Sequence, residues 1–467
     1  MQARQVRLML SVMVVAALLG LSTLAQTTLQ ARPKAKTFLI RDAALALTMD
    51  PAIGSGRLGR LENADVYVVG GQIAAVGQDL VVNDKDVEVI DARGKIVMPG
   101  FVDTHNHLWQ TLIRGCGTDD EIPTWLPGCV YSLAGPTLTR EDAYAIVRLG
   151  VLDALQTGVT TVLDFSHSFN PEFVRGYIRA LDESGLRYVY VYRVRNNPAT
   201  LEDARTVKRE LIDPNPLATL QIGQHPSQAL RNDLAAAVRL SNELGVDLNV
   251  HLLEHFSDRG ERPVELLESL GALNARLVVN HVVHPTDEEI QLLAARGVRV
   301  THNPLSNMRL ASGVMPIEKF QQAGAKIGLG LDGGANDTSD MFNLMRAAVG
   351  LQRAKHLDAS AYPTVEDALW LATMGGAEVL GMQERIGSLT PGKQADLLII
   401  DPATLNFAPR IDWVSQLVFN GQPHNVEWVF VAGRPLKAKG KLVGVNERKV
   451  IEAAEQVADK VRAIITR

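Results

Sequence analysis

The feature that most constrains this chain is an eightfold alternation of apolar, β-branched runs with amphipathic stretches of helical spacing. Runs of the first kind indicate buried strands, whereas the stretches between them, such as 143–155 and 234–244, indicate helices. Eight consecutive βα units predict an α/β fold, a closed (β/α)8 barrel. A doubly wound open sheet is the alternative, but no G-x-G-x-x-G sequence follows the first run. The eight predicted strands are 97–103, 159–165, 188–194, 217–223, 246–250, 277–280, 298–301 and 327–331.

The two flanks of the barrel region have a different pattern, because residues 26–96 and 385–445 alternate short strands with turns. Neither flank is long enough to bury a hydrophobic core of its own. We therefore expect both ends of the chain to build one small, composite β-sandwich beside the barrel, which would span residues 97–384. The last stretch, 446–467, has the spacing of a closing helix.

The first 25 residues have the pattern of a secretory signal peptide. Arg4 and Arg7 precede the apolar run 8–21, and Ala25 offers a small residue at the expected cleavage point. An uncleaved membrane anchor is the alternative, although the run is short for a membrane span. We expect an exported protein, periplasmic or secreted, with no membrane span after cleavage.

Composition excludes several partners and scaffolds. The chain has 47 Lys+Arg against 52 Asp+Glu, so its net charge of −5 gives no electrostatic footprint for nucleic acid or anionic lipid. Two cysteines exclude a disulfide scaffold and an all-cysteine zinc site. In an oxidising compartment Cys116 and Cys129 could pair, but two free buried cysteines fit the sequence equally well.

Side chains that bind metals lie at the carboxyl ends of the predicted strands. His105 and His107 follow the first strand, where residues two apart point to the same side. His251 ends the fifth strand, and Asp332 ends the eighth. Barrel active sites are built at this face. Imidazoles with one carboxylate suit Zn²⁺ as first choice and Fe²⁺ as second, and such an ion lowers the pKa of a water molecule to about 7.

Two further strand-end residues suit proton transfer. Glu254 lies three residues after His251, so it should reach the cavity without binding the ion and move a proton between water and substrate. A salt-bridged glutamate at the rim is the alternative. His281, at the end of the sixth strand, is expected to polarise the substrate or hold the water. Asp332 is expected to act both as a ligand and as a proton acceptor.

Other residues near the strand ends are candidates for substrate contact. Trp109 and Gln110 follow the first strand and could stack on and hydrogen-bond a flat ring. Arg309 faces either a substrate anion or the solvent. The remaining candidates for the pocket are His167, His225, His302 and Asn303. The histidines interpreted as structural or exposed are His255, His284, His356 and His424.

The motifs together resemble the amidohydrolase superfamily, most closely its branch of cytosine- and guanine-deaminase-like and triazine-hydrolase (chlorohydrolase) enzymes. The resemblance implies His105, His107, His251 and Asp332 as metal ligands, Glu254 and His281 as catalytic residues, the composite β-sandwich and a homo-oligomer, commonly a dimer. The motifs that carry it are the run 98–107, His251-x-x-Glu254, His281, His302-Asn303-Pro304-x-Ser306-Asn307, Leu331-Asp332-Gly333 and the run 386–397.

Two departures narrow the resemblance. Binuclear relatives carry a carboxylated lysine at the end of strand 4, whereas the run 220–225 holds no lysine, so one metal ion per subunit is expected. Most members of the branch also lack a signal peptide, which argues against a cytosolic nucleobase-salvage role.

The sequence therefore predicts a metal-dependent hydrolase of a small nitrogen-containing molecule, cleaving a C–N bond other than a peptide bond. Hydrolytic deamination of an N-heterocycle is the first choice. Hydrolysis of a cyclic amide or urea and hydrolytic dehalogenation are alternatives of the same class. A secreted binding protein with a catalytically dead barrel is the alternative of another class, and it predicts missing ligands, yet none is missing.

Overall fold

The computed structural model describes residues 37–83, 87–133, 138–336 and 338–465. The predicted signal peptide, residues 1–25, lies outside them. No helix within these ranges has both the length and the apolar composition that crossing a bilayer requires.

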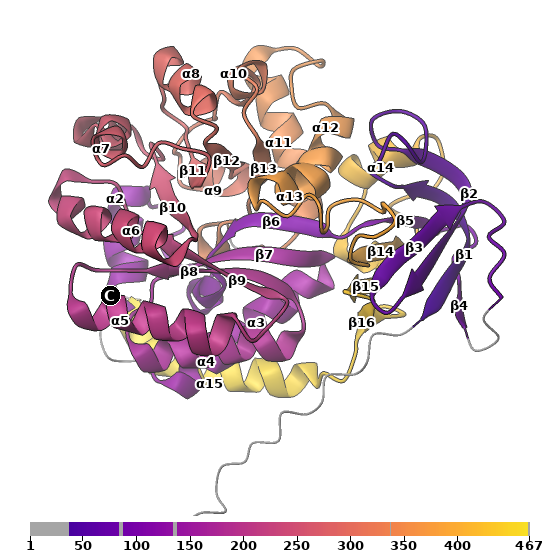
Figure 1. Ribbon diagram of the computed structural model, residues 1–467, viewed down its shortest axis with the longest axis horizontal. Coiled ribbons are helices and arrows are strands. Elements are labelled where there is room, and N and C mark those ends of the chain that lie inside the picture. The colour runs from indigo at the N-terminus through magenta and orange to yellow at the C-terminus, as the bar shows by residue number, and fades with distance from the viewer. Residues whose placement is uncertain (1–36, 84–86, 134–137, 337, 466–467) are drawn as a thin grey trace, which may run out of the picture. The chain divides into compact units, whose positions relative to one another are not determined.

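Eight parallel strands form the barrel sheet, and each strand pairs with its neighbours in chain order from β6 to β13 (Figure 1). All eight predicted strands are present, and the predicted (β/α)8 architecture is confirmed. Their near-continuous apolar sequences agree with strands that are buried on both faces. The strands are β6 (Phe101–Asn106), β7 (Val159–Ser166), β8 (Arg187–Arg193), β9 (Ala218–Gly223), β10 (Asp247–Leu252), β11 (Leu277–His281), β12 (Arg299–His302) and β13 (Ile327–Leu329).

The segment predicted as the first barrel strand is divided between two sheets. Residues Ile96–Pro99 form β5, which pairs with β1 and β14 outside the barrel, and the barrel strand β6 begins only at Phe101. The division falls at Gly100, where an added Cβ would lie 2.1 Å from the side chain of Thr160. A glycine is therefore needed where the chain passes from one sheet to the other.

Helices connect the barrel strands, and several begin with a capping box, in which the first and fourth residues exchange hydrogen bonds. Thr286 accepts a hydrogen bond from the backbone N–H of Glu289, whose carboxylate accepts one in return, and Thr364 pairs with Asp367 in the same way. The main helices are α3 (Arg140–Gln156), α4 (Pro171–Ser184), α5 (Pro198–Val207), α6 (Arg231–Leu244), α7 (Pro263–Ser269), α8 (Asp287–Ala295), α9 (Pro304–Arg309), α10 (Ile317–Gln322), α11 (Met341–His356), α12 (Val365–Trp370), α13 (Gly376–Val379) and α14 (Trp413–Phe419).

Both ends of the chain contribute to the second β unit, as predicted, and hydrogen bonds join its nine strands in one mixed sheet. The antiparallel pair β5–β14 joins the N-terminal strands to the C-terminal ones, and Phe38 stacks on Phe430 within a separate core. Besides β5, the strands are β1 (Phe38–Leu47), β2 (Arg60–Val69), β3 (Gln72–Gly77), β4 (Glu88–Asp91), β14 (Leu397–Ile400), β15 (Val426–Val431), β16 (Arg434–Ala438) and β17 (Lys441–Leu442).

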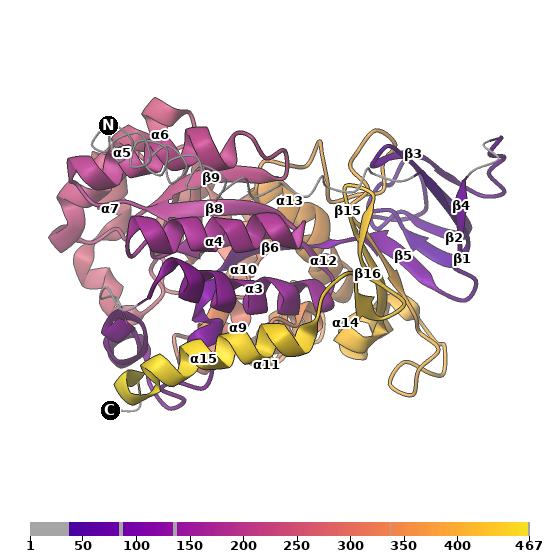
Figure 2. The same ribbon diagram turned by 90° about the horizontal axis from the view of Figure 1, so that it is seen from below.

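The predicted closing helix is α15 (Glu447–Ile465), which packs against α3. Figure 2 shows it running along the barrel beside α3. Its Lys460 donates to the buried carboxylate of Asp142 on α3, 2.6 Å away. This ion pair thus fixes α15 to α3.

Candidate metal centre and active site

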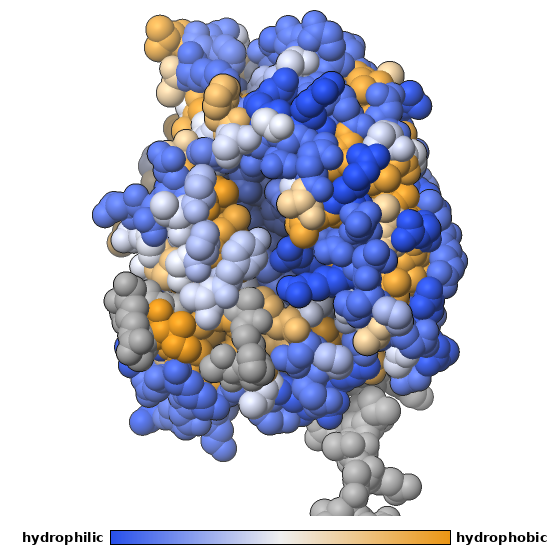
Figure 3. All heavy atoms as spheres, turned by 90° about the vertical axis from the view of Figure 1, so that its left-hand side faces the viewer, coloured by the Kyte–Doolittle hydropathy of each residue, from blue (hydrophilic) through white to orange (hydrophobic). Residues whose placement is uncertain are grey.

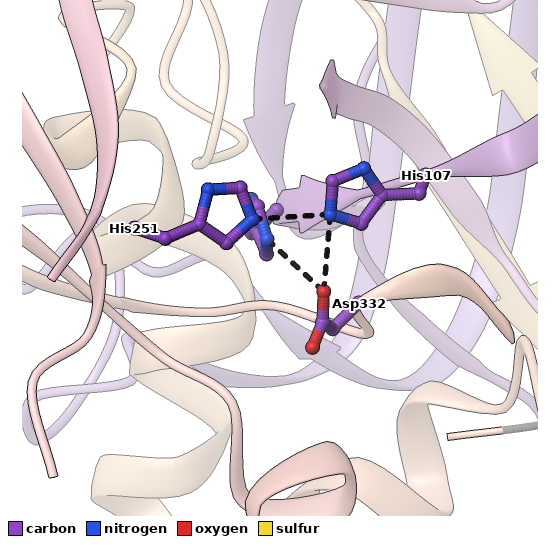
Figure 4. A group of neighbouring side chains, drawn as sticks. His107, His251 and Asp332 are labelled. Atoms are coloured by element: carbon purple, nitrogen blue, oxygen red, sulfur yellow. Dashed lines mark hydrogen bonds and ion pairs between the residues drawn. The ribbon is translucent and has the colours of Figure 1, made fainter. Parts of the chain in front are cut away.

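Four side chains from three strand ends converge at one face of the barrel. His105 and His107 come from β6, His251 comes from β10 and Asp332 follows β13, and their candidate ligand atoms all lie within 4.8 Å of one another. Asp332 Oδ1 is 3.1 Å from His105 Nε2 and 3.4 Å from His107 Nε2. His107 Nε2 is 3.2 Å from His251 Nε2. Figure 4 shows His107, His251 and Asp332 pointing toward a common centre.

The protonation states of this group suit a divalent cation. Burial lowers the pKa of His105 to about 3 and that of His251 well below its ordinary value, so both imidazoles offer neutral lone pairs. Burial alone would raise the pKa of Asp332, but the neighbouring histidines hold it well below the usual range. His105 Nδ1 has no hydrogen-bond partner among the described residues. Three imidazoles and one carboxylate are a zinc-type donor set.

A second layer of contacts orients the candidate ligands. His107 Nδ1 donates to the carbonyl oxygen of Phe165, 2.6 Å away, and this bond leaves the Nε2 lone pair facing the centre. The backbone N–H of Asp332 donates to the carbonyl oxygen of His105 at 2.8 Å. Asp332 itself has a φ of 63°, in the left-handed region. A non-glycine residue in this region is strained, and residues strained in this way are common at functional sites, where the surrounding structure holds them in place.

Glu254 and His281 lie beside this centre. His281 Nδ1 is 3.6 Å from Glu254 Oε1, and His281 Nε2 is 3.8 Å from Asp332 Oδ2. Burial, together with the charges of Asp332 and Asp258, raises the pKa of Glu254 well above its usual value, so this carboxyl can carry a proton. His281 Nδ1 also donates to Asn307 Oδ1 at 3.0 Å, which fixes the orientation of the ring.

One pocket opens onto these groups, and several of the predicted substrate residues line it. Gln110, His167 and His225 face the pocket together with His107, His251, Glu254 and Asp332. Gln110 Oε1 also accepts a hydrogen bond from the backbone N–H of Gly334 at 3.2 Å. Figure 3 looks onto the side of the molecule that carries α2 (Ile122–Trp125), and this face is hollowed near its centre.

The other predicted contacts lie behind the pocket wall. Trp109 is fully buried, and its Nε1 donates to His167 Nδ1 at 3.0 Å, so it supports a pocket residue from behind. Asn303 Oδ1 accepts from the backbone N–H of His281 at 3.3 Å. His302 is buried, and burial lowers its pKa to about 3. Arg309 is not among the residues that line this pocket. Its side chain is partly buried, and its guanidinium donates to the carbonyl oxygen of Cys116 at 3.0 Å.

The histidines interpreted as structural or exposed lie away from the pocket lining. His284 Nε2 donates to the carbonyl oxygen of Ser312 at 2.7 Å, and His424 is exposed beside Asn406. His255 precedes a short helical turn and lies 3.6 Å from Glu121, and His356 ends α11.

Several pocket residues do not stand out in the sequence reasoning. Arg193 ends β8, so the strand-end rule that found the histidines could also have found it. Ile122, Trp125, Leu126 and Tyr131 lie in the long connection after β6. Long loops at this face of a barrel commonly carry function, so the length of this connection was a usable signal.

Comparison with known proteins defines the class. A model described as the amidohydrolase family matches residues 96–436, and the chain belongs to this family. It is an enzyme of the carbon–nitrogen hydrolase type, acting on bonds other than peptide bonds. The family resemblance stated from the motifs is confirmed.

Its curated relatives include deaminases of adenosine derivatives. The chain is 31% identical over 443 residues to a 5'-deoxyadenosine deaminase from Methanobrevibacter smithii, covering 91% of this chain and 98% of the relative. It is 34% identical over 415 residues to a 5-methylthioadenosine/S-adenosylhomocysteine deaminase from Bacillus cereus, covering 85% and 94%.

Two solved structures have a fold similar to that of this chain. An adenosine deaminase from Xanthomonas campestris with bound zinc has a TM-score of 0.80 and 29% sequence identity, covering 92% of this chain and all of that one. An atrazine chlorohydrolase from Arthrobacter aurescens TC1 has a TM-score of 0.80 at 23% identity, covering 90% of this chain, and this likeness shows the fold alone.

Proposed function

We propose that the protein hydrolytically deaminates the aminopurine ring of a small adenosine derivative and releases ammonia. One observation carries the proposal: three imidazoles and a carboxylate converge beside a buried glutamate whose pKa is raised, and His107, His251, Asp332 and this glutamate line one pocket. The activities that the names of the curated relatives state support the choice of ring.

His105, His107, His251 and Asp332 would hold one divalent cation, for which we propose Zn²⁺, with Fe²⁺ as the second choice. The donor set supports zinc, as does the zinc bound in the Xanthomonas structure. When bound, a divalent ion supplies Lewis acidity at this point and lowers the pKa of a water molecule. The end of β9 carries Gly223, Gln224 and His225 and no lysine, which supports a single ion.

The chain's own residues then move the protons. Asp332, whose carboxylate lies 3.1 Å from His105 Nε2 and within 4.8 Å of the Glu254 carboxylate, accepts a proton from the attacking water. Burial raises the pKa of Glu254 well above its usual value, which suits this carboxyl to act as the acid that donates to a ring nitrogen next to the amino-bearing carbon. The water oxygen bonds to that carbon, the carbon–nitrogen bond breaks, and the amino group leaves as ammonia with the proton that Asp332 accepted. The proton from Glu254 stays on the ring nitrogen, and the remaining hydroxyl proton passes to Glu254 and restores its acid form. His281 Nε2 faces the same centre and orients the attacked atom.

We also propose that the protein works outside the cytoplasm. The basic start and apolar run of the first 25 residues support export, and the Cys116–Cys129 disulfide supports an oxidising compartment. The homodimer stays an expectation from the family resemblance.

The decisive experiment measures ammonia release from adenosine, 5'-deoxyadenosine, 5'-methylthioadenosine and S-adenosylhomocysteine, with guanine, cytosine and a triazine as further substrates. Glu254→Gln should lower kcat by about 10³-fold, because it removes proton transfer and leaves the candidate ligands in place. The matched control is Glu265→Gln, whose side chain is exposed on α7. Near-normal turnover by Glu254→Gln, with metal content unchanged, would refute the assigned role.

A further inference from the structure

One wall of the pocket is built from a loop that a disulfide closes. The loop lies between Cys116 and Cys129, which are joined as a disulfide with a sequence separation of 13. Within it, Ile122, Trp125 and Leu126 line the same pocket as Glu254 and three of the candidate metal ligands, His107, His251 and Asp332. We call residues 116–129 the clamped wall.

Both ends of the clamped wall are fixed in the core. Cys129 is 2% exposed and Cys116 is 9% exposed. The carbonyl oxygen of Cys116 accepts two hydrogen bonds, one from Trp125 Nε1 at 3.1 Å and one from Arg309 Nη2 at 3.0 Å. The first bond ties the pocket-lining indole to the disulfide, and the second ties the disulfide to the end of α9, the helix that also carries Asn307.

Regular structure within the clamped wall is short. It contains α2 (Ile122–Trp125) and most of the helical turn η2 (Leu126–Val130), four and five residues long. Helices of this length are not stable on their own, because most of their backbone N–H and C=O groups lack a hydrogen-bond partner within the helix. Without the cross-link, therefore, the loop would have to lose conformational freedom each time it closes on a ligand.

We propose that the Cys116–Cys129 disulfide is a positioning element for substrate binding, which keeps the clamped wall in the conformation that contacts the substrate ring. This inference rests on the proposed function. Cys116 and Cys129 act through Trp125 and its neighbours and not on the reacting atoms. Loss of the disulfide therefore raises KM, because a loop that must be ordered on binding weakens ground-state and transition-state binding alike.

Metal binding should not depend on the clamped wall. The four candidate ligands lie on β6 or directly after it, on β10 and in the loop after β13, and none lies between residues 116 and 129. The chemical step uses Glu254 and Asp332, which are also outside the wall. A disulfide-free protein should therefore keep its metal content and its kcat.

The test compares the full-length, metal-loaded wild type with Cys116→Ala/Cys129→Ala. We expect KM for the best adenosine derivative to rise roughly tenfold, with kcat within about twofold and metal content unchanged. Chymotrypsin should cut after Trp125 faster in the variant, and mass spectrometry identifies the product. If the variant does not fold, wild type treated with a dithiol reductant and then reoxidised gives the same comparison reversibly.

Two results would overturn the proposal. The first is an unchanged KM and an unchanged cleavage rate after Trp125 in protein whose thiols titrate as free. The second is a fall in kcat with KM unchanged. A failure of the proposed function is distinguishable, because wild type would then release no ammonia, whereas cleavage after Trp125 would still report on the clamped wall.

Discussion

The carboxylate of Asp103 accepts a hydrogen bond from the backbone N–H of Leu331, 3.0 Å away, across the seam between β6 and β13. Among the described strands these two form no regular ladder, so individual bonds close the barrel here. Thr104 Oγ1 donates to the carbonyl oxygen of Leu329 at 3.0 Å. Because His105 and Asp332 lie on opposite sides of this seam, its closure sets their spacing.

Asp103→Ala should therefore weaken metal binding about 10- to 100-fold, as the loss of groups that orient ligands usually does. Asp103 also accepts from the backbone N–H of His105 and from Asn106, so the variant leaves buried donors unpaired and loses about 3 kcal/mol of unfolding free energy. Metal titration and denaturant unfolding measure the two effects. Asp142→Ala, a buried aspartate that caps α3, is the control and should keep its metal.

His107→Ala should bind metal far more weakly, because it removes one of the four converging groups. Elemental analysis of purified protein measures this, and dialysis against a chelator should abolish ammonia release until zinc is returned. His424→Ala, at an exposed site, should behave as wild type. Full metal content in His107→Ala would contradict the proposed ligand set.

Asn307→Leu should lower kcat by about 10- to 100-fold with metal content unchanged, because the His281 ring loses the acceptor for its Nδ1–H. Asn307→Asp keeps an acceptor at that position and should be impaired less. Steady-state kinetics of both variants measure the difference. Equal losses in the two variants would show that the hydrogen bond does not position His281.

Arg187 on β8 and Asp396 before β14 form a two-pronged ion pair at 2.8 and 3.2 Å, and both side chains are at most 2% exposed. Asp396→Leu leaves a buried guanidinium without its carboxylate and should reduce the unfolding free energy by about 3–5 kcal/mol. Arg187→Met/Asp396→Leu removes both charges and should be more stable than the single variant. Denaturant unfolding of the three proteins checks this order.

Burial lowers the pKa of Lys437 on β16 to about 8, and its ammonium donates to the carbonyl oxygen of Gln156 at 2.7 Å. Between this value and the unfolded-state pKa, near 10.4, the unfolded chain binds more protons than the folded one. Stability from this group therefore rises with pH across that window. The unfolding free energy of Lys437→Met, measured by urea unfolding, should fall relative to that of the wild type as the pH increases from 8 to 10. A difference that does not vary with pH would contradict the assignment.

The barrel could be predicted from the sequence because eight apolar runs recur with amphipathic stretches between them, and a parallel sheet buries such runs on both faces. The convergence of His105, His251 and Asp332 followed from one rule, that strand ends of a barrel share a face. The division at Gly100 was not predicted: Pro99-Gly100 is a local turn signal within residues 97–103, but nothing local assigns the first half of this segment to another sheet. The position of Trp109 depends on a tertiary hydrogen bond to His167.

The disulfide that closes the clamped wall could not be predicted, for a different reason. Two cysteines in a chain of this length allow a disulfide or two free thiols, and only the path of the connection after β6 brings them together. The residues that this connection places at the pocket, Ile122, Trp125 and Leu126, have the composition of ordinary core residues.

The pairing of β5 with β14 has a consequence for the order in which the molecule is completed. Val97 meets Ile399 and Met98 meets Leu398, with the whole barrel between them in the chain. The sheet that contains the first strands can therefore be completed only after the C-terminal strands have been synthesised, and pairings between such distant segments form slowly. A fragment ending inside the barrel would leave one side of β5 without its partner, and an exposed strand of this kind invites pairing with other chains and aggregation.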